Sequence, residues 1–440
     1  MNNTLNLRTN FLKYTSLNIL GMVGFSFYIL VDTFFIALAL GTNGLAGLSF
    51  ALPVFSIFQG IGLMIAIGSA TLFSVNKASD LKATTDTSFT HAILLAIFFG
   101  LLFILAGLLF SREIGSLLGA SGEVLDLTDI YLNILLMFVP FFMINHVFMA
   151  FIRNDLNPKL PMIAMITSSI FNVILDYILM FPFGLGMAGA SLATAISPLV
   201  SILILSRHLY KKQNTFHLAK CKIQFSKFIE TFKLGLSSLI SEVATGISST
   251  TFNLLIFSVA GNTGVAAYSV IINIALVVIC MLNGLAQGAQ PLSSVAFGTK
   301  NISSLNKLLK YSISFSLFIS LLVYIVLLFF VDGIVSIFNT ENNIELAEIA
   351  RDGTFIYFIG YFFAGLNIVG AAYLSSILKP KRAMAISALR GIFVFVPVAI
   401  LFCELLGLVG IWISFGASEF IVLLITLFFL KQAAKENLKI

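Results

Sequence analysis

Five ionisable side chains lie inside long apolar stretches of the sequence, and four of the five are acids. They are Asp32, Asp176, Glu242, Arg390 and Glu419. In a membrane-spanning helix each such charge costs roughly 2.5–3.5 kcal/mol, so these residues usually face a cavity or pair with one another. Carboxyl groups withdrawn from water attract protons and small cations. The cysteines and histidines show no metal-ligand spacing, and we predict neither a catalytic residue nor an enzyme activity.

Asp32 and Asp176 form the first candidate site. Asn172 precedes Asp176 by one helical turn, so both side chains project from the same face of a helix. Both aspartates are predicted a few residues before the outer ends of their segments, at a similar depth, and Thr194 in the next segment adds a hydroxyl oxygen. We predict that these four residues take up a coupling cation, H+ or Na+. The alternative is that each aspartate only satisfies a local hydroxyl group or a helix break.

Glu242, Arg390 and Glu419 form the second set and are all predicted near mid-membrane. An arginine between two carboxylates is typical of a neutralising network. A purely structural role and a role in substrate binding or gating both stay open. If Glu242 and Arg390 pair, a double charge swap should restore the stability that the single swaps lose.

A polar stretch between these charges contains Gln287, Gln290 and Pro291. Proline inside a span frees a carbonyl group and permits a kink. The two glutamines are candidates for substrate contact or gating, and Pro291 is a candidate hinge. A kink that neighbouring side chains simply fill is an equally good interpretation.

The composition shows which elements must position these residues. Of the 440 residues, 59% are hydrophobic and 10% are charged, whereas a soluble protein carries about 25% charged residues. A bilayer core needs about 20 apolar residues per helix, and this rule predicts an all-α membrane protein with twelve spans. The predicted spans are 12–39, 46–76, 88–110, 126–151, 160–181, 187–209, 228–259, 264–297, 306–330, 345–375, 383–403 and 407–431.

The positive charges predict the orientation of these spans. With the N-terminus inside, nearly all of the 25 Lys and Arg residues fall in cytoplasmic segments, whereas the outer loops are acidic. We therefore expect a multi-pass protein of the cell (inner) membrane with both termini cytoplasmic. The excess of Lys and Arg over Asp and Glu is explained by the orientation of the spans, so we expect no nucleic-acid partner. The polar run 207–233 is the predicted linker between two halves.

An internal repeat divides the chain at this linker. With an offset of about 220 residues, Gly41 and Gly44 fall on Gly261 and Gly264, and the series continues along both halves with Asn145 on Asn367 and Gly186 on Gly407. Six spans per half give the two copies the same orientation, related by an axis along the membrane normal. We predict two six-helix bundles, an N-lobe at 1–215 and a C-lobe at 216–440, which face each other across a cavity.

In this order and spacing the motifs resemble those of the multidrug and toxic compound extrusion (MATE) transporters over nearly the whole chain. The first half contributes 31–36, 41–46, 153–162, 172–177 and 186–194, and the second half contributes 235–242, 287–291, 389–391, 410–412 and 418–419. The resemblance implies an antiporter that exports drug-like, often cationic or aromatic compounds by alternating access, driven by inward flow of H+ or Na+. It also implies ion coupling at Asp32, Asn172, Asp176 and Thr194. Another branch of the family uses acids on the seventh and tenth spans, but here the tenth span has no acid between Phe355 and Leu378, and Glu242 precedes the corresponding point in the seventh.

Two other functions remain as alternatives. A flippase for lipid-linked oligosaccharides would need a basic cavity for pyrophosphate, whereas the spans hold one arginine against four acids. An intramembrane aspartyl protease would need a Gly-x-Gly-Asp context, which neither Asp32 nor Asp176 has. We expect small-molecule substrates, the lipid bilayer as surroundings, a monomer, and no cofactor beyond the coupling ion.

Overall fold

The computed structural model describes residues 4–79, 85–219, 224–339 and 343–437, and the regular structure in these ranges is helical. The helices are α1 (Thr4–Ala78), α2 (Thr85–Leu117), α3 (Gly122–Met137), α4 (Val139–Asn154), α5 (Lys159–Met180), α6 (Gly186–Tyr210), α7 (Phe225–Gly298), α8 (Ile302–Phe338), α9 (Ile344–Ser376), α10 (Pro380–Ala388), the π-helical turn η2 (Leu389–Phe393) and α11 (Phe395–Asn437). The all-α class is therefore confirmed. The predicted linker 207–233 includes residues 220–223, which lie outside the described ranges.

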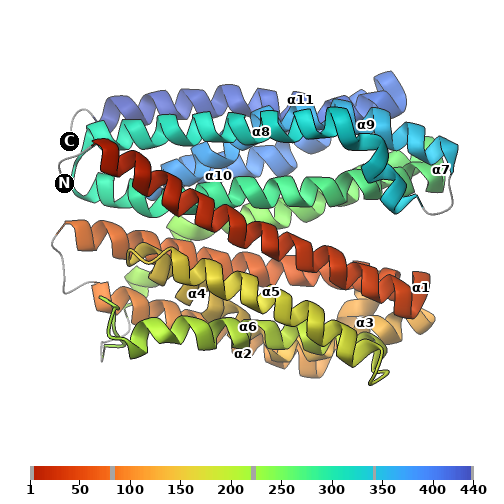
Figure 1. Cartoon of the computed structure of the whole chain (residues 1–440), viewed down its shortest axis with the longest axis horizontal. Helices are drawn as coiled ribbons and strands as arrows, with labels where there is room; N and C mark the ends of the chain where they lie inside the picture. Colours follow the sequence, from red (N-terminus) through yellow and green to blue (C-terminus); the bar gives the residue numbers. More distant parts are fainter. Residues whose placement is uncertain (1–3, 80–84, 220–223, 340–342, 438–440) are drawn as a thin grey trace. The chain divides into compact units, whose positions relative to one another are not determined.

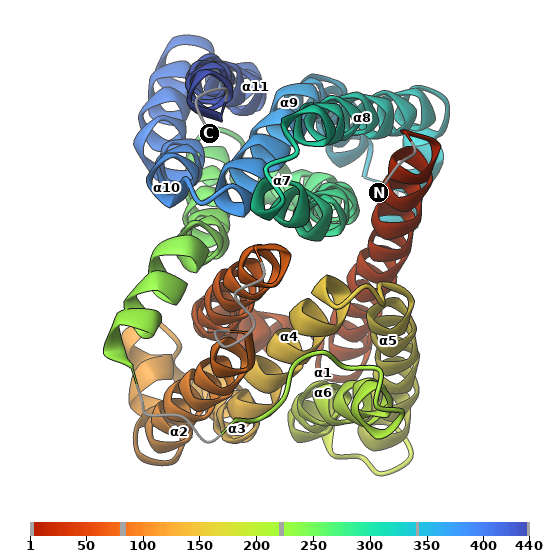
Figure 2. The ribbon, with the colours of Figure 1, turned by 90° about the vertical axis from the view of Figure 1, so that its left-hand side faces the viewer.

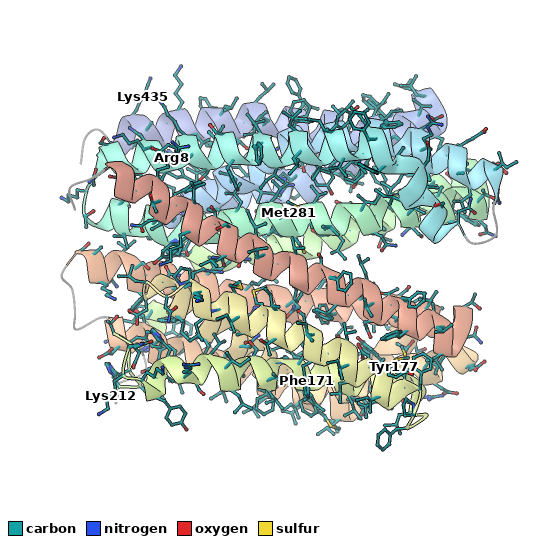
Figure 3. The ribbon with its side chains drawn as sticks, viewed as in Figure 1. Arg8, Phe171, Tyr177, Lys212, Met281 and Lys435 are labelled. Atoms are coloured by element: carbon teal, nitrogen blue, oxygen red, sulfur yellow. The ribbon has the colours of Figure 1, made fainter. Side chains whose placement is uncertain are left out.

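Large apolar side chains cover the outer faces of these helices. Phe98 and Leu109 on α2 and Phe329 on α8 are each more than half exposed, and Figure 3 shows such side chains along the helices of each half. Apolar surface on this scale is unfavourable in water and favourable against lipid. Within the described ranges, eight helical segments are long and apolar enough to cross a membrane.

Glycines break three of these long segments into two spans each. Gly41 in α1 has φ 60° and ψ −148°, Gly261 in α7 has φ 58° and ψ −151°, and Gly407 in α11 has φ 57° and ψ −135°. Only glycine adopts this backbone region readily, because it has no Cβ. Helices α3 and α4 meet at 51° as one broken span. Division at the glycines, with that pair counted once, gives the twelve predicted spans.

These glycines also bear out the internal repeat. Gly41 and Gly261, which the repeat aligns, share nearly the same dihedral angles. Gly407 aligns with Gly186, and both have positive φ. In both halves the chain therefore changes direction at corresponding positions, and in each case a glycine with positive φ makes the change possible.

The chain forms two compact units, and each contains one segment from the other half of the sequence. Unit 1 comprises Met1–Ile19 and Ala244–Ile440, and unit 2 comprises Leu20–Val243. The exchange follows from two close helix crossings. A Cβ added to Gly288 of α7 would lie 2.7 Å from Cα of Thr15, and one added to Gly68 of α1 would lie 2.1 Å from the carbonyl oxygen of Thr231.

The compact units therefore differ from the predicted lobes, 1–215 and 216–440, because the first turns of α1 and α7 pack against the half to which they do not belong by sequence. The lobes were defined by the internal repeat, whereas the units are defined by compactness, so the lobes remain a prediction. The first turn of α1 and the last turn of α11 both belong to unit 1, and Figure 1 shows them at the same end of that unit. Arg8 and Lys435 are exposed at this end in Figure 3.

Candidate cation site

Helices α1, α5 and α6 of unit 2 bring the four predicted coupling residues together. Figure 2, in which the helices are seen nearly end-on, shows α5 beside α6. The first half of α1 packs on α5 through two glycines: a Cβ on Gly21 would lie 3.1 Å from Sδ of Met165, and one on Gly24 would lie 3.3 Å from Cγ1 of Ile166. From these contacts the two helices run in the same direction, and two to three turns later they carry Asp32 and Asp176.

We call Asp32, Asn172, Asp176 and Thr194 the aspartate site. All four residues are buried, with exposed fractions between 0% and 6%. When the Asn172 amide is oriented to satisfy its surroundings, its nitrogen donates to Oδ2 of Asp176 at 3.0 Å and its oxygen accepts from the backbone N–H of Thr194 at 3.2 Å. The amide therefore ties α5 to α6 at the site.

The carboxyl groups of Asp32 and Asp176 lie within hydrogen-bonding reach of each other. Two carboxyl groups can hydrogen bond only when one of them carries a proton. Two adjacent carboxylates otherwise repel, and one of them must be neutralised by a proton or a cation. The geometry thus matches the expectation that the pair shares one positive charge.

Three buried oxygens of the site meet no donor at hydrogen-bonding geometry: Oδ1 of Asp32, Oδ1 of Asp176 and Oγ1 of Thr194, beside which the phenol of Tyr131 lies. A buried polar atom without a partner costs about 1–3 kcal/mol, so such atoms are uncommon unless they bind something. Carboxylate and hydroxyl oxygens are ligands that hard cations prefer. The donor set therefore fits a small cation such as Na+, and the carboxyl pair alone fits a proton.

Sequence reasoning missed two aromatic residues beside this site. Tyr28 and Tyr131 are buried, and Tyr131 on α3 lies close enough to Asp32 and Asp176 to interact with them electrostatically. The backbone carbonyl of Tyr131 accepts a hydrogen bond from Oγ of Ser191 on α6 at 2.8 Å. Ten of the 11 tyrosines lie in the predicted spans, and neither Tyr28 nor Tyr131 has a spacing that distinguishes it from the others.

In unit 1 the structure pairs two of the three residues in the second predicted set. Nε and Nη2 of Arg390 donate to Glu419 at 2.7–3.0 Å, and Glu419 is 3% exposed. Asn367 and Thr426, which had not been singled out as site residues, complete this network. Glu242 belongs to unit 2, so its predicted pairing with Arg390 remains a prediction.

The polar stretch of α7 is helical throughout. Gln290 is buried and its amide donates to Oγ of Ser294 at 3.2 Å. It lines a small cavity with Ser293, Ser312 and Tyr373, while Gln287 also has an interaction partner. The backbone of α7 departs from helical geometry at Gly261, and the helix runs on through Pro291. The hinge at Pro291 thus remains a prediction.

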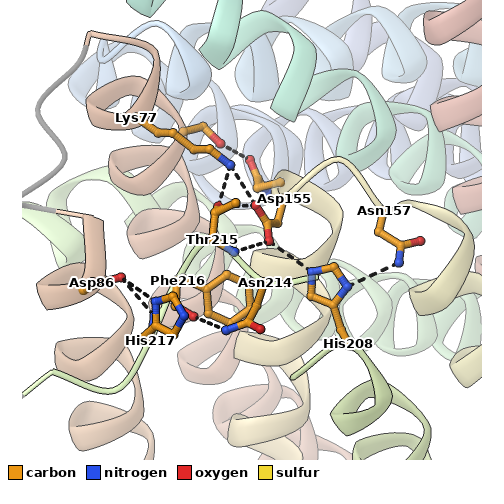
Figure 4. Close-up of polar contacts among 11 residues, drawn as sticks. Lys77, Asp86, Asp155, Asn157, His208, Asn214, Thr215, Phe216 and His217 are labelled. Carbon is orange, nitrogen blue, oxygen red and sulfur yellow. Dashed lines mark hydrogen bonds and ion pairs between the residues drawn. The ribbon is translucent and has the colours of Figure 1, made fainter. Parts of the chain in front are cut away.

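A further polar cluster surrounds the buried carboxylate of Asp155 and was not predicted from the sequence. Asp155, directly after α4, accepts hydrogen bonds from Lys77 at the end of α1, from His208 on α6 and from Thr215 in the segment that follows α6. Figure 4 shows these four residues, which we call the Asp155 cluster. Charged residues near helix ends normally face water, so nothing in the sequence indicated that Asp155 and His208 are buried. The side chain of Lys77 is 34% exposed.

Comparisons with known proteins agree with this architecture. The family model described as MatE matches residues 18–178 and 238–401. The multidrug export protein MepA of Staphylococcus aureus is 27% identical over 401 residues, which cover 89% of this chain and 86% of MepA. The match thus extends over most of both proteins.

Solved structures show the same fold. One, described as the outward-facing conformation of a multidrug resistance MATE family transporter of the MOP superfamily, aligns with a TM-score of 0.93 at 20% identity, over 99% of this chain and 97% of that one. A mutant of the Vibrio cholerae MATE transporter VcmN aligns with a TM-score of 0.91 at 22% identity, over 98% of each chain. The predicted fold of twelve membrane-spanning helices in two bundles is thereby confirmed.

Proposed function

The chain belongs to the MatE family, and from this membership and the aspartate site we propose that it is a secondary active antiporter that exports drug-like small molecules. It is a multi-pass membrane transporter, and the expectation that it is not an enzyme is confirmed by the family. We further propose that inward flow of H+ or Na+ drives export by alternating access. The name of its relative MepA, a multidrug export protein, supports the substrate class.

The observation that carries the proposed coupling is the set of three buried oxygens at the aspartate site that meet no donor at hydrogen-bonding geometry. A cation bound there neutralises the carboxyl pair and removes the penalty for enclosing it among apolar helices. The ion can drive the conformational change only by binding one arrangement more tightly than the other. The aspartate site supplies such a difference, because a charged pair and a neutralised pair differ in the cost of their burial.

Cationic or neutral cargo fits the remaining charges better than anionic cargo does. Arg390, the one arginine predicted within the spans, is held by Glu419, so it offers little positive charge to a pyrophosphate group. This pairing argues against the flippase alternative. We retain Glu242, Gln287, Gln290, Arg390 and Glu419 as proposed substrate or gating residues and Pro291 as a proposed hinge. We also propose a monomer in the inner membrane with both termini in the cytoplasm.

The experiment that tests coupling compares Asp32→Asn and Asp176→Asn with wild type in proteoliposomes. Each substitution keeps the shape of the side chain and removes its negative charge. We expect both variants to lose ethidium transport driven by an imposed Na+ or pH gradient while they elute as folded protein in size-exclusion chromatography. Asp126→Asn is the matched control, because Asp126 forms an exposed ion pair with Arg112. Unchanged gradient-driven transport in either site variant would refute the assignment.

A third variant in the same assay identifies the ion. Thr194→Val removes one oxygen ligand and leaves both carboxyl groups in place. If Na+ is the coupling ion, the Na+ concentration for half-maximal transport should rise at least several-fold, because Na+ loses a ligand. If H+ is the coupling ion, the pH profile should stay unchanged, because the carboxyl pair alone holds the proton.

A further inference from the structure

The C-terminal half contains a buried polar network that is chemically comparable to the aspartate site. Arg390 binds both carboxylate oxygens of Glu419, with Nε at 3.0 Å and 2.9 Å and Nη2 at 2.7 Å from Oε1. Asn367 on α9 donates to Oε2 of Glu419 at 2.7 Å and to its backbone carbonyl at 2.9 Å. Thr426 completes the network by donating to Oδ1 of Asn367 at 2.7 Å. The network thus comprises a carboxylate, an amide, a hydroxyl and one fixed cation.

The arginine is carried by an irregular element. Residues Leu389–Phe393 form the single π-helical turn η2 between α10 and α11. Such turns are rare and occur frequently at functional sites. Two contacts with α7 fix this turn: Oγ of Ser248 donates to the carbonyl oxygen of Gly391 at 3.1 Å, and a Cβ on Gly391 would lie 2.0 Å from Cβ of Ala244. The backbone that carries Arg390 is therefore held in place.

The two sites share two pairs of corresponding helices, α5 with α10–η2 and α6 with the second half of α11, but their third helices differ, α1 in one site and α9 in the other. They also differ in how their oxygens are satisfied. The aspartate site has three buried oxygens that meet no donor at hydrogen-bonding geometry, whereas Glu419 and Asn367 have none. No basic side chain hydrogen bonds to the aspartate site among the described residues, whereas Arg390 fills this role in the network. Tyr357 and Tyr361 on α9 are close enough to Glu419 to interact with it electrostatically, and a neutral phenol carries no negative charge that would compete for the guanidinium.

We propose that Arg390 is a tethered counter-ion that permanently occupies a monovalent-cation site formed by Glu419 and Asn367. Consequently only the N-terminal half responds to the coupling ion. This inference rests on the proposed ion-coupled transport. It makes Arg390 a determinant of coupling stoichiometry: without its guanidinium, Glu419 and Asn367 become a second site for the transported H+ or Na+.

The number of coupling ions per substrate sets the largest substrate gradient that an ion gradient can support. At zero membrane potential, each additional ion multiplies this limit by the ion concentration ratio. The experiment measures ethidium accumulation in proteoliposomes under a tenfold gradient of Na+ or H+, with the potential clamped by valinomycin and K+. We expect Arg390→Gln to raise the limiting accumulation ratio about tenfold above wild type. The accumulation ratio should also depend more steeply on ion concentration, because one additional ion takes part in each transport cycle.

Two further variants separate this proposal from a merely structural ion pair. Arg390→Lys keeps a tethered cation and should preserve the wild-type limiting accumulation ratio, which depends on the number of coupling ions and not on substrate affinity or transport rate. Arg390→Gln combined with Glu419→Gln leaves no unpaired buried charge, so it should fold and return the ratio to the wild-type value. An unchanged ratio in folded Arg390→Gln would overturn the proposal. If Arg390→Gln does not fold, the double variant provides the test. Loss of ion-driven accumulation in the double variant would then overturn the proposal, because it would show that the Arg390–Glu419 pair is itself required for coupling.

Failure of the underlying function has a different signature. If Asp176→Asn keeps wild-type accumulation, the aspartate site does not couple transport and the proposed function fails, whatever Arg390→Gln does. If Asp176→Asn abolishes accumulation while folded Arg390→Gln leaves the ratio unchanged, the proposed function stands and the tethered counter-ion is refuted.

Discussion

Removal of the Asp155 carboxylate should destabilise the N-terminal half more than removal of an exposed one. Oδ1 lies 2.7 Å from Nζ of Lys77, and Oδ2 accepts from Nε2 of His208 at 3.0 Å and from the backbone N–H of Thr215 at 2.8 Å. The hydroxyl of Thr215 donates to Oδ1 as well. The carboxylate side chain is 1% exposed. Asp155→Ala therefore leaves a buried imidazole, an amide and a hydroxyl without their acceptor.

The expected magnitude follows from this geometry. Loss of the acceptor leaves the buried imidazole of His208 unsatisfied, which costs about 1–3 kcal/mol, whereas Lys77, whose side chain is 34% exposed, regains water. In a cooperative unit of about 200 residues each kcal/mol lowers Tm by about 2–4 °C, so a loss of about 1–3 kcal/mol corresponds to about 2–12 °C. Asp126→Ala is the matched control: its ion pair with Arg112 is 2.8 Å long but more than half exposed, and such pairs contribute about 0–1 kcal/mol.

The assay is thermal unfolding in detergent, followed by size-exclusion chromatography with fluorescence detection, and its pH dependence gives a second test. Burial raises the pKa of Asp155, but the hydrogen bonds from His208, Lys77 and Thr215 outweigh it and hold that pKa below its usual value. The stabilisation is thus fully present above the unfolded pKa of about 3.9 and is lost as pH falls through the folded pKa. The Tm difference between wild type and Asp155→Ala should therefore narrow below about pH 4. Equal Tm losses in Asp155→Ala and Asp126→Ala would refute the reasoning.

Two further predictions concern glycines. Gly235→Ala should abolish the monodisperse folded fraction in size-exclusion chromatography, because its Cβ would lie 1.9 Å from the carbonyl oxygen of Met64, whereas Gly246→Ala, with nothing within 4 Å, should not. Gly41→Ala should lower the free energy of unfolding by about 1–3 kcal/mol in detergent titration, because alanine is strained in this backbone region; Gly333→Ala on α8 should not lower it, and equal losses would contradict the strain argument.

The sequence predicted the features that depend on composition and on spacing within one helix. The apolar spans follow from the few charges, and Asn172 with Asp176 follows from the helical repeat. The meeting of Asp32 with Asp176 needed an assumption about depth in the membrane, which the α1–α5 packing supports. The glycine alignment predicted corresponding positions, but the dihedral angles that make Gly41 and Gly261 chain breaks within α1 and α7 came from the structure.

What could not be predicted depends on which surfaces tertiary packing covers. Asp155 and His208 look like solvated residues near the ends of helices, and they are buried only because the segment after α6 folds back over them. Asn367 was recognised as the repeat partner of Asn145, but its contact with Glu419 depends on how α9 packs against α11. The exchanged first turns of α1 and α7 were likewise invisible, because glycine spacing does not say which helix will lie against it.

In the proposed mechanism, the energies involved are consistent with one open site that drives transport while the second site stays filled by Arg390. A tenfold ion gradient is equivalent to about 1.4 kcal/mol, whereas an uncompensated charge at the centre of a membrane helix costs roughly 2.5–3.5 kcal/mol. Neutralising the aspartate site therefore changes the conformational balance by more than the gradient supplies per ion, and the gradient only has to keep the site loaded from one side. Glu419 contributes no such change while Arg390 stays bound to it, since its charge is compensated in every state that preserves the pair. Because the buried carboxylate of the C-terminal half is always neutralised by Arg390, this half can change conformation together with the N-terminal half without binding an ion itself.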